Sequence, residues 1–160
     1  MTTLMRSHHN LRSDMAQVSS SSTILIDAEP AKVLDAIADY RQVRPRILSP
    51  HYSDYRVVSG GQGRGTVAAW KLQATKSRVR AVQADVDVAG HTVIERDVNS
   101  SLVTNWTVAP AVPGCSVTVK TTWTGGNGVK GFFERVFAPL GLRRIQDEVL
   151  ANLKKEMETA

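Results

Sequence analysis

The sequence predicts an α+β fold: a curved antiparallel sheet of about seven strands around one long C-terminal helix, with two short helices between the first two strands. Residues 52–124 alternate apolar and polar side chains between closely spaced turn signals, which is typical of consecutive short strands. The C-terminal segment instead repeats apolar residues at steps of three and four, the period of an amphipathic helix. A chain of 160 residues is long enough for one such domain.

The first part of the chain is polar and has no periodicity, so we expect a disordered tail over residues 1–16 and a single domain over residues 17–160. The first strand is predicted at residues 18–27, with Val18, Ser20, Ser22, Ile24 and Ile26 on one side. Pro30 suits the first turn of a short helix that follows. Pro45 then limits the next segment to a second, poorer helical turn.

Further strands are predicted at residues 52–59, 65–75, 78–89, 91–98, 102–109 and 115–124. The turns between them are short, which favours an antiparallel meander. One turn lies in the glycine-rich stretch VVSGGQGRGTVAAW and raises the question of a phosphate-binding loop. Such a loop leads into a helix, whereas residues 66–70 have the pattern of a strand. We therefore expect a β-hairpin loop whose glycines adopt positive φ angles.

The predicted C-terminal helix has one apolar face, made of Leu142, Ile145, Val149, Leu153 and Met157. Pro139 and Gly141 predict a kink or break upstream of this face. A strongly curved sheet touches a straight helix only in part, so we expect a cavity between them. The phenylalanines before the break either plug that cavity or act as its lid; they are Phe132, Phe133 and Phe137.

A net charge of +5 and an isoelectric point of about 9.7 raise the question of nucleic-acid binding. The basic residues are scattered without interleaved aromatic residues, so we expect no nucleic-acid partner. Groups such as Arg41, Arg44 and Arg46 are interpreted as solvated, with some preference for anionic ligands and at most transient contact with a membrane surface. No stretch approaches the roughly 20 apolar residues of a membrane span, and no secretory signal is recognisable, so a cytoplasmic location is expected.

The cysteine and histidine residues of the chain give little support to a metal site or to a catalytic nucleophile. The single cysteine, Cys115, excludes an internal disulfide and is interpreted as a small packed thiol. The four histidines lie in the N-terminal stretch or stand alone near turns. We therefore expect no metal site and no cofactor.

Acid–base catalysis has one weak candidate pair, Glu95 and Asp97, which share one face of their strand. If Ile94, Arg96 and Val98 face the core, both carboxylates point to solvent. No catalytic residue is therefore assigned.

Alternation predicts which strand residues face the helix and its cavity. Even-numbered residues face inward on the strands at 65–75, 78–89 and 102–109, and odd-numbered residues on the strand at 115–124. The candidate ligand-binding residues are Trp70, Leu72, Arg78, Arg80, Val82, Val86, Trp106, Val119, Phe133 and Phe137. Each tryptophan either stacks on a flat ligand or fills the core. The two arginines either hold a carboxylate or phosphate headgroup or are solvated at a strand end.

Several segments occur in an order that is similar to a known superfamily: STILIDAEPAKVLDAIADY, a glycine-rich hairpin into GTVAAW, TVIERDV, LVTNWTVAP, CSVTVKTTW and FFERVFAPLGLRRI. Residues 17–158 resemble the START-like (SRPBCC) superfamily of polyketide cyclase/dehydrase and lipid-transport proteins. The resemblance implies the helix-grip fold, actinobacterial relatives, and a cavity for a lipid, polyketide or sterol-like molecule. It implies no particular reaction, because the same fold carries transporters, sensors and cyclases.

Three function hypotheses follow. The leading one is binding or transport of a hydrophobic small molecule without catalysis, an anionic headgroup being one option. The alternative is an enzyme of the polyketide cyclase/aromatase type, in which polar groups of the cavity assist proton transfer. The third is an interaction protein whose cavity has collapsed around its tryptophans. They differ in cavity size and in whether titratable residues line it.

Overall fold

The computed structural model describes residues 17–76, 78–124 and 139–159. Its elements are β1 (Gln17–Ile26), α2 (Pro30–Ile37), α3 (Val43–Ile47), β2 (Tyr52–Ser59), β3 (Val67–Thr75), β4 (Arg78–Ala89), β5 (Thr92–Asp97), β6 (Val103–Pro110), β7 (Cys115–Thr124) and α5 (Pro139–Glu158). These elements agree with the predicted ones in kind and order. The tail expected at residues 1–16 and the phenylalanines Phe132, Phe133 and Phe137 lie outside the described residues.

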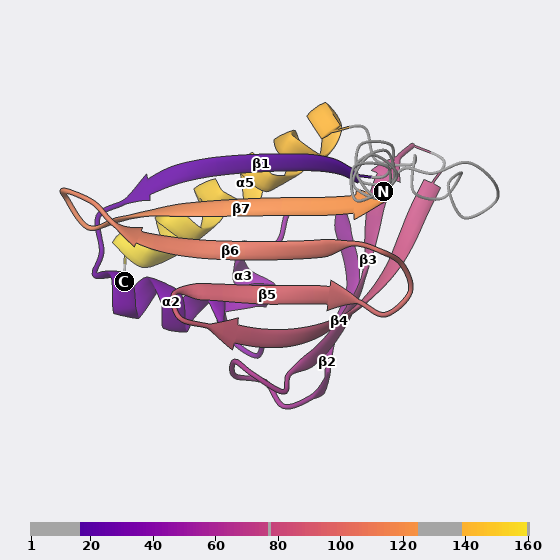
Figure 1. Ribbon diagram of the computed structural model, residues 1–160, viewed down its shortest axis with the longest axis horizontal. Helices are drawn as coiled ribbons and strands as arrows, with labels where there is room; N and C mark the ends of the chain where they lie inside the picture. The colour runs from indigo at the N-terminus through magenta and orange to yellow at the C-terminus, as the bar shows by residue number, and fades with distance from the viewer. Residues whose placement is uncertain (1–16, 77, 125–138, 160) are drawn as a thin grey trace, which may run out of the picture.

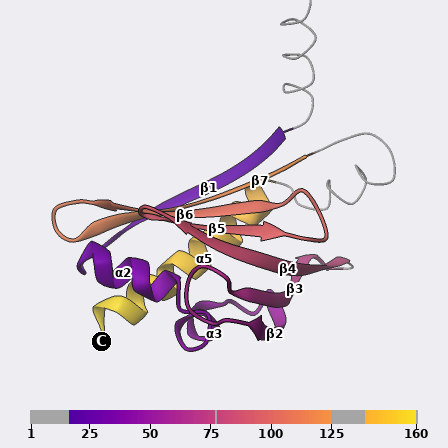
Figure 2. The same cartoon turned by 60° about the horizontal axis from the view of Figure 1, so that its bottom comes forward.

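The described strands form one antiparallel sheet in the order β1-β7-β6-β5-β4-β3-β2 (Figure 1). Strands β2 to β7 pair in chain order, which confirms the predicted meander. β1 forms one edge by pairing with β7 from Gln17 opposite Thr124 to Ile26 opposite Cys115. β2 and β3 cross the direction of β6 and β7 steeply in Figure 1, so the sheet is strongly twisted. Figure 2 shows α2, α3 and α5 on one side of the sheet, which confirms the helix-grip fold.

The described part of helix α5 runs from Pro139 to Glu158. The residues before Pro139 lie outside the described ranges, so the break expected at Pro139 and Gly141 stays a prediction. The buried face of α5 consists of Leu142, Ile145, Gln146, Val149, Leu150 and Leu153. Polar contacts add to this packing, since Ser20 Oγ donates to Gln146 Oε1 at 3.0 Å and Ser22 donates to Asp147. Inward-facing serines of β1 thus dock the N-terminal half of the helix.

The glycine-rich stretch forms the loop between β2 and β3, as predicted. Gly60, Gly61, Gly63 and Gly65 all have positive φ angles. The loop lies against the connection between α2 and α3, where the Tyr40 N–H donates to the Gly61 carbonyl and the Gly63 N–H donates to the Ala38 carbonyl, both at 2.9 Å. Its role in the described structure is therefore to hold the backbone at Tyr40 in place.

The core lies between the concave face of the sheet and the helices. The predicted inward faces are confirmed on three strands by the buried residues Thr66, Ala68, Trp70, Leu72, Leu102, Trp106, Val108, Val117, Val119, Thr121 and Trp123. On β4, Val82, Ala84 and Val86 are also buried. Cys115 is buried as well, and its burial raises the pKa of its thiol. Among the described helices, none has the length and apolar character needed to cross a bilayer.

Candidate functional site

A cavity of about 50 Å³ lies between the concave face of the sheet and α5. Most of its wall is apolar or aromatic: Leu48, Tyr52, Trp70, Leu72, Leu102, Trp106, Val119, Leu142 and Val149. The polar lining residues are Arg44, Glu95, Thr104, Thr121 and Gln146. The cavity therefore combines an apolar wall with a small set of polar groups, as ligand pockets usually do.

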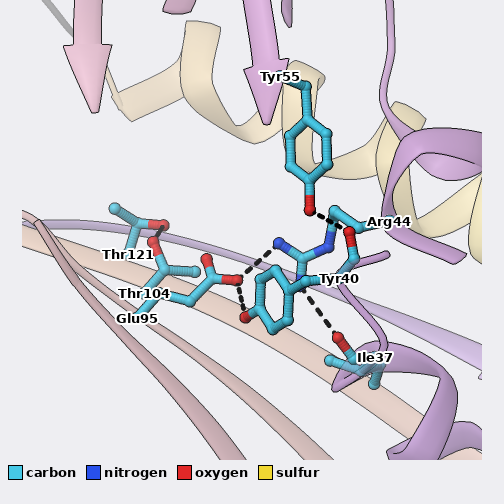
Figure 3. Close-up of polar contacts among 7 residues, drawn as sticks. All are labelled: Ile37, Tyr40, Arg44, Tyr55, Glu95, Thr104 and Thr121. Carbon is cyan, nitrogen blue, oxygen red and sulfur yellow. Dashed lines mark hydrogen bonds and ion pairs between the residues drawn. The ribbon is translucent and has the colours of Figure 1, made fainter. Parts of the chain in front are cut away.

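A buried ion pair dominates the polar lining (Figure 3). Arg44 Nη1 donates to Glu95 Oε2 at 2.6 Å, and the hydroxyl of Tyr40 donates to the same oxygen at 2.5 Å. Arg44 Nη2 donates to the Ile37 carbonyl at 3.2 Å. Arg44 is 2% exposed and Glu95 6% exposed. Burying two charges is tolerated here because each is hydrogen-bonded and faces its opposite.

Aromatic rings enclose the guanidinium of Arg44. Its central carbon lies 4.4 Å from the ring centre of Tyr40 and 4.8 Å from that of Trp106. Both distances are within the range of cation–π attraction. On the neighbouring wall, Tyr55 stacks on Trp70 at 6.2 Å and Tyr52 meets the same indole edge-on at 6.5 Å.

The chain between α2 and α3 positions these groups. Asp39 Oδ1 accepts hydrogen bonds from the N–H groups of Arg41 and Gln42, at 3.1 and 2.9 Å, and so supports the start of α3. Arg44 lies in the first turn of α3. The hydroxyl of Tyr55 donates to the Tyr40 carbonyl at 2.6 Å and ties β2 to the same point.

Pro45 follows Arg44 in this first turn, where its missing N–H has no helical partner to lose. A five-residue helix around a proline is thus enough to present Arg44 to the sheet.

The ion pair and burial perturb the surrounding titratable groups. Burial raises the pKa of Tyr40 well above its ordinary value, and the charge of Glu95 raises it further. Burial also raises the pKa of Tyr52, and raises that of Tyr55 to about 12. Burial alone would lower the pKa of Arg44, but the charge and hydrogen bond of Glu95, together with the neighbouring tyrosines, outweigh burial, so the pKa lies above its ordinary value. Arg44 therefore stays charged and the tyrosines stay protonated across the physiological range.

A second polar group lies where β6, β7 and α5 meet. The hydroxyls of Thr104 and Thr121 are 2.9 Å apart, and Gln146 Nε2 donates to Thr121 Oγ1 at 3.2 Å. Residue Thr104 lies opposite Glu95 in the sheet register. These neutral groups extend the polar lining from the ion pair toward α5.

Two buried donors of the lining have no acceptor among the described residues. They are Arg44 Nε and the indole Nε1 of Trp106. A buried donor without an acceptor is costly, so such atoms are candidates for contact with a bound molecule.

Only some of the site residues predicted from the sequence line the cavity. Trp70, Leu72, Trp106 and Val119 line the cavity. Val82 and Val86 are buried in the same core but are not part of the lining. The side chain of Arg78 is exposed and that of Arg80 is half-buried, and neither lines the cavity. Phe133 and Phe137 lie outside the described residues. Binding by any of these residues stays a prediction.

The outward placement of Glu95 and Asp97 was wrong. On β5 the inward residues are Val93, Glu95 and Asp97, with Glu95 opposite Val86 on β4 and Thr104 on β6. The sequence held a signal for this. Gly90 and His91 form a two-residue turn that pairs Ala89 with Thr92, so inward even-numbered residues on β4 require inward odd-numbered residues on β5.

The interpretation of Arg44 as solvated was also wrong, because its side chain is buried against Glu95. No local pattern marks this residue. Its burial depends on a carboxylate from a distant strand that compensates its charge.

Elsewhere in the described residues, neither the surface grooves nor the acidic side chains form a better site. A shallow, open groove of about 640 Å³ lies beside α2 and the C-terminal part of α5, and half of its lining residues are charged: Lys32, Asp35, Asp39 and Glu156. Within the described ranges, no group of three or more His, Cys, Asp or Glu side chains is arranged to hold a metal ion. The cavity beside Arg44 and Glu95 is therefore the candidate site.

Comparisons with known proteins agree with this fold. The chain is similar over 90% of its length to the KanY protein, whose solution structure is known, with 75% identity, 99% coverage of that chain and a TM-score of 0.82. It is similar in fold to the Zhui aromatase/cyclase from Streptomyces sp. R1128, with 12% identity, a TM-score of 0.67 and coverage of 89% and 94% of the two chains.

A further similarity, with 19% identity and a TM-score of 0.66, is to the di-domain aromatase/cyclase BexL, of which the match covers 50%. It covers 89% of the present chain. No curated protein matches the chain. The model of the family described as polyketide cyclase/dehydrase and lipid transport matches residues 17–158, and the chain therefore belongs to this family, within the SRPBCC superfamily.

Proposed function

We propose that this protein binds an apolar small molecule in the cavity between the sheet and α5, with a polar group of that molecule directed at Arg44 and Glu95. The observation that carries the proposal is the lining itself: a mostly apolar wall with a buried ion pair and two buried donors that have no acceptor among the described residues. Membership in a family that includes lipid-transport proteins supports the same conclusion.

The size of the cavity limits how binding proceeds. A volume of about 50 Å³ exceeds the space of one water molecule but is well below the roughly 300–1,000 Å³ of a pocket for a drug-sized ligand. A larger molecule must therefore displace side chains, and the lining residues of α5 are Leu142, Gln146 and Val149. We expect binding to shift α5 relative to the sheet.

The first experiment is native mass spectrometry, with organic extraction, of the protein purified from its own host. A co-purified acyl, isoprenoid or polyketide species at near-stoichiometric level supports the proposal and names the ligand class. If the purified protein carries no such molecule and binds none of a panel of lipids and polyketides, the result would instead favour the hypothesis of an interaction protein with a collapsed cavity.

A pair of variants localises the binding. Val119 lines the cavity, whereas Lys120, the next residue on β7, is exposed on the other face. Val119→Phe places a phenyl ring in the space that the ligand would occupy and should lower the affinity for the extracted molecule by about tenfold or more. Lys120→Phe introduces the same side chain outside the cavity and should leave the affinity unchanged. Equal losses in both variants would contradict binding at this site.

A second candidate function, an enzyme of the polyketide cyclase/aromatase type, is favoured by one observation. Titratable groups, Tyr40, Arg44 and Glu95, form one hydrogen-bonded cluster at the cavity, and such groups can assist proton transfer. The discriminating measurement is recovery of the bound molecule after prolonged incubation with the protein. A chemically unchanged molecule supports binding alone, whereas a cyclised or dehydrated product supports the enzyme.

A further inference from the structure

We propose that the cavity selects molecules whose polar group is uncharged, and that Glu95 is the residue that excludes anions. This inference rests on the proposed binding function and specifies its ligand class. It also departs from the option of an anionic headgroup that Arg78 and Arg80 suggested in the sequence.

The first argument is the charge of the lining. Among the described residues that line the cavity, the charged ones are Arg44 and Glu95. Their side chains lie 2.6 Å apart, so the positive charge of Arg44 is already compensated. The remaining polar lining residues, Thr104, Thr121 and Gln146, are neutral. The described lining thus offers no uncompensated positive charge to an incoming carboxylate or phosphate.

The second argument is the repulsion that an anion would meet. To reach Arg44, an anionic group must approach Glu95, which is held beside the guanidinium. The repulsion from Glu95 offsets the attraction to Arg44, so the cost of taking an anionic group out of water stays uncompensated, which corresponds to about tenfold or more in affinity. Glu95 is almost fully buried, so little water is available to screen this repulsion.

The third argument is hydrogen-bonding capacity. Glu95 Oε2 accepts from Arg44 and Tyr40, while its other oxygen makes no hydrogen bond to the residues drawn in Figure 3. A hydroxyl or amide of a ligand can donate to this carboxylate and also accept from Arg44 Nε or Trp106 Nε1. A carboxylate can only accept. The lining therefore complements a neutral donor–acceptor group such as a phenol, an alcohol or an amide.

The test compares neutral and anionic molecules of equal shape. Two scaffolds are used, a naphthyl ring and a dodecyl chain, each as the primary amide and as the carboxylate, and binding is measured by isothermal titration calorimetry at neutral pH. Amide and carboxylate are nearly isosteric, so the ratio of their affinities reports charge. On the wild-type protein we expect each amide to bind at least about tenfold more tightly than its carboxylate.

Matched variants assign the selectivity to Glu95. Glu95→Gln keeps the size of the side chain and removes its charge. It should therefore raise the affinity for the carboxylates and lower the ratio of amide affinity to carboxylate affinity by about tenfold or more. Asp97→Asn makes the same chemical change on the same face of β5, at a carboxylate that is equally buried but does not line the cavity. It should leave the ratio at the wild-type value.

The outcomes separate the two proposals. Carboxylates that bind as tightly as amides to the wild-type protein overturn the exclusion of anions but leave binding in the cavity intact. A ratio that Asp97→Asn changes as much as Glu95→Gln overturns the role of Glu95. If neither scaffold binds in either form, the proposed function fails and this inference fails with it. The wild-type ratio does not depend on whether a variant folds.

Discussion

Glu95 and Asp97 stand two residues apart on the same face of β5 and are 6% and 7% exposed, yet their surroundings differ. Asp97 accepts hydrogen bonds from the N–H groups of Gln83 and Asn99, at 3.1 and 3.0 Å, and from Ser100 Oγ at 2.7 Å. These partners belong to the adjacent strand and the following turn. Glu95 is held by Arg44 and Tyr40, which belong to the helical segment across the core.

The difference shows that burial of a carboxylate does not by itself mark a functional site. Asp97 is satisfied by local donors and closes the turn between β5 and β6, which is a structural role. Glu95 faces a compensating charge and also borders a cavity. The two carboxylates therefore differ in whether their partners are local or come from a distant segment, and in whether they line the cavity. Variants at each position test this difference.

The largest effect is expected from removing one member of the ion pair. Arg44→Met leaves Glu95 buried without a compensating charge and should lower the free energy of unfolding by about 3–5 kcal/mol. The double variant Arg44→Met/Glu95→Leu removes both charges and should lose at least about 1 kcal/mol less than the sum of the two single losses. Urea unfolding of the four proteins measures this coupling, and strictly additive losses would contradict a functional ion pair in the folded state.

A smaller effect is expected at the structural carboxylate. Asp97→Ala removes the acceptor of three hydrogen bonds and should lower the free energy of unfolding by about 1–3 kcal/mol. Affinity for the naphthyl amide should stay at the wild-type value, because Asp97 does not line the cavity. Urea unfolding and calorimetric titration check the two parts, and a clear loss of affinity would remove the distinction between the two carboxylates.

The smallest effect concerns alkaline pH and the tyrosines that surround Glu95. All three tyrosines of the chain have raised pKa values; burial is the largest cause in each case, and the charge of Glu95 raises each pKa further. The pKa of Tyr40 is higher in the folded than in the unfolded protein, so its stabilising contribution is complete below pH 10 and is lost as the pH rises through the folded value. For buried Tyr40 the loss is about 1.4 kcal/mol per pH unit.

Tyrosinate absorbance during alkaline titration measures this effect. In the wild-type protein tyrosinate should form above the ordinary pKa of 10.0 and rise together with unfolding. Glu95→Gln should move the onset to lower pH because the negative charge that opposes tyrosinate is gone. Asp97→Asn should leave the onset of tyrosinate formation unchanged. A shift of equal size in both variants would show that the charge of Glu95 has no specific effect on the pKa values of the tyrosines.

Much of the fold was predictable because it depends on short-range patterns. The turn chemistry at Gly60–Gly65 and the apolar face of α5 predicted their elements correctly. Alternation on a strand fixes the face of each side chain, and four of the candidate residues line the cavity as a result: Trp70, Leu72, Trp106 and Val119. The error at Glu95 came from placing Ile94, Arg96 and Val98 on the core face, although the two-residue turn at Gly90–His91 implied the opposite alternation.

The sequence by itself determined the kind and order of the elements and the inward faces of most strands, because periodicity and turn residues act between neighbours in the chain. Only the tertiary structure decided that Arg44 and Tyr40 meet Glu95, 51 and 55 residues away along the chain. The physical reason is that a charged side chain is buried only where an opposite charge from another element compensates it. No local pattern distinguishes such an arginine from a solvated one.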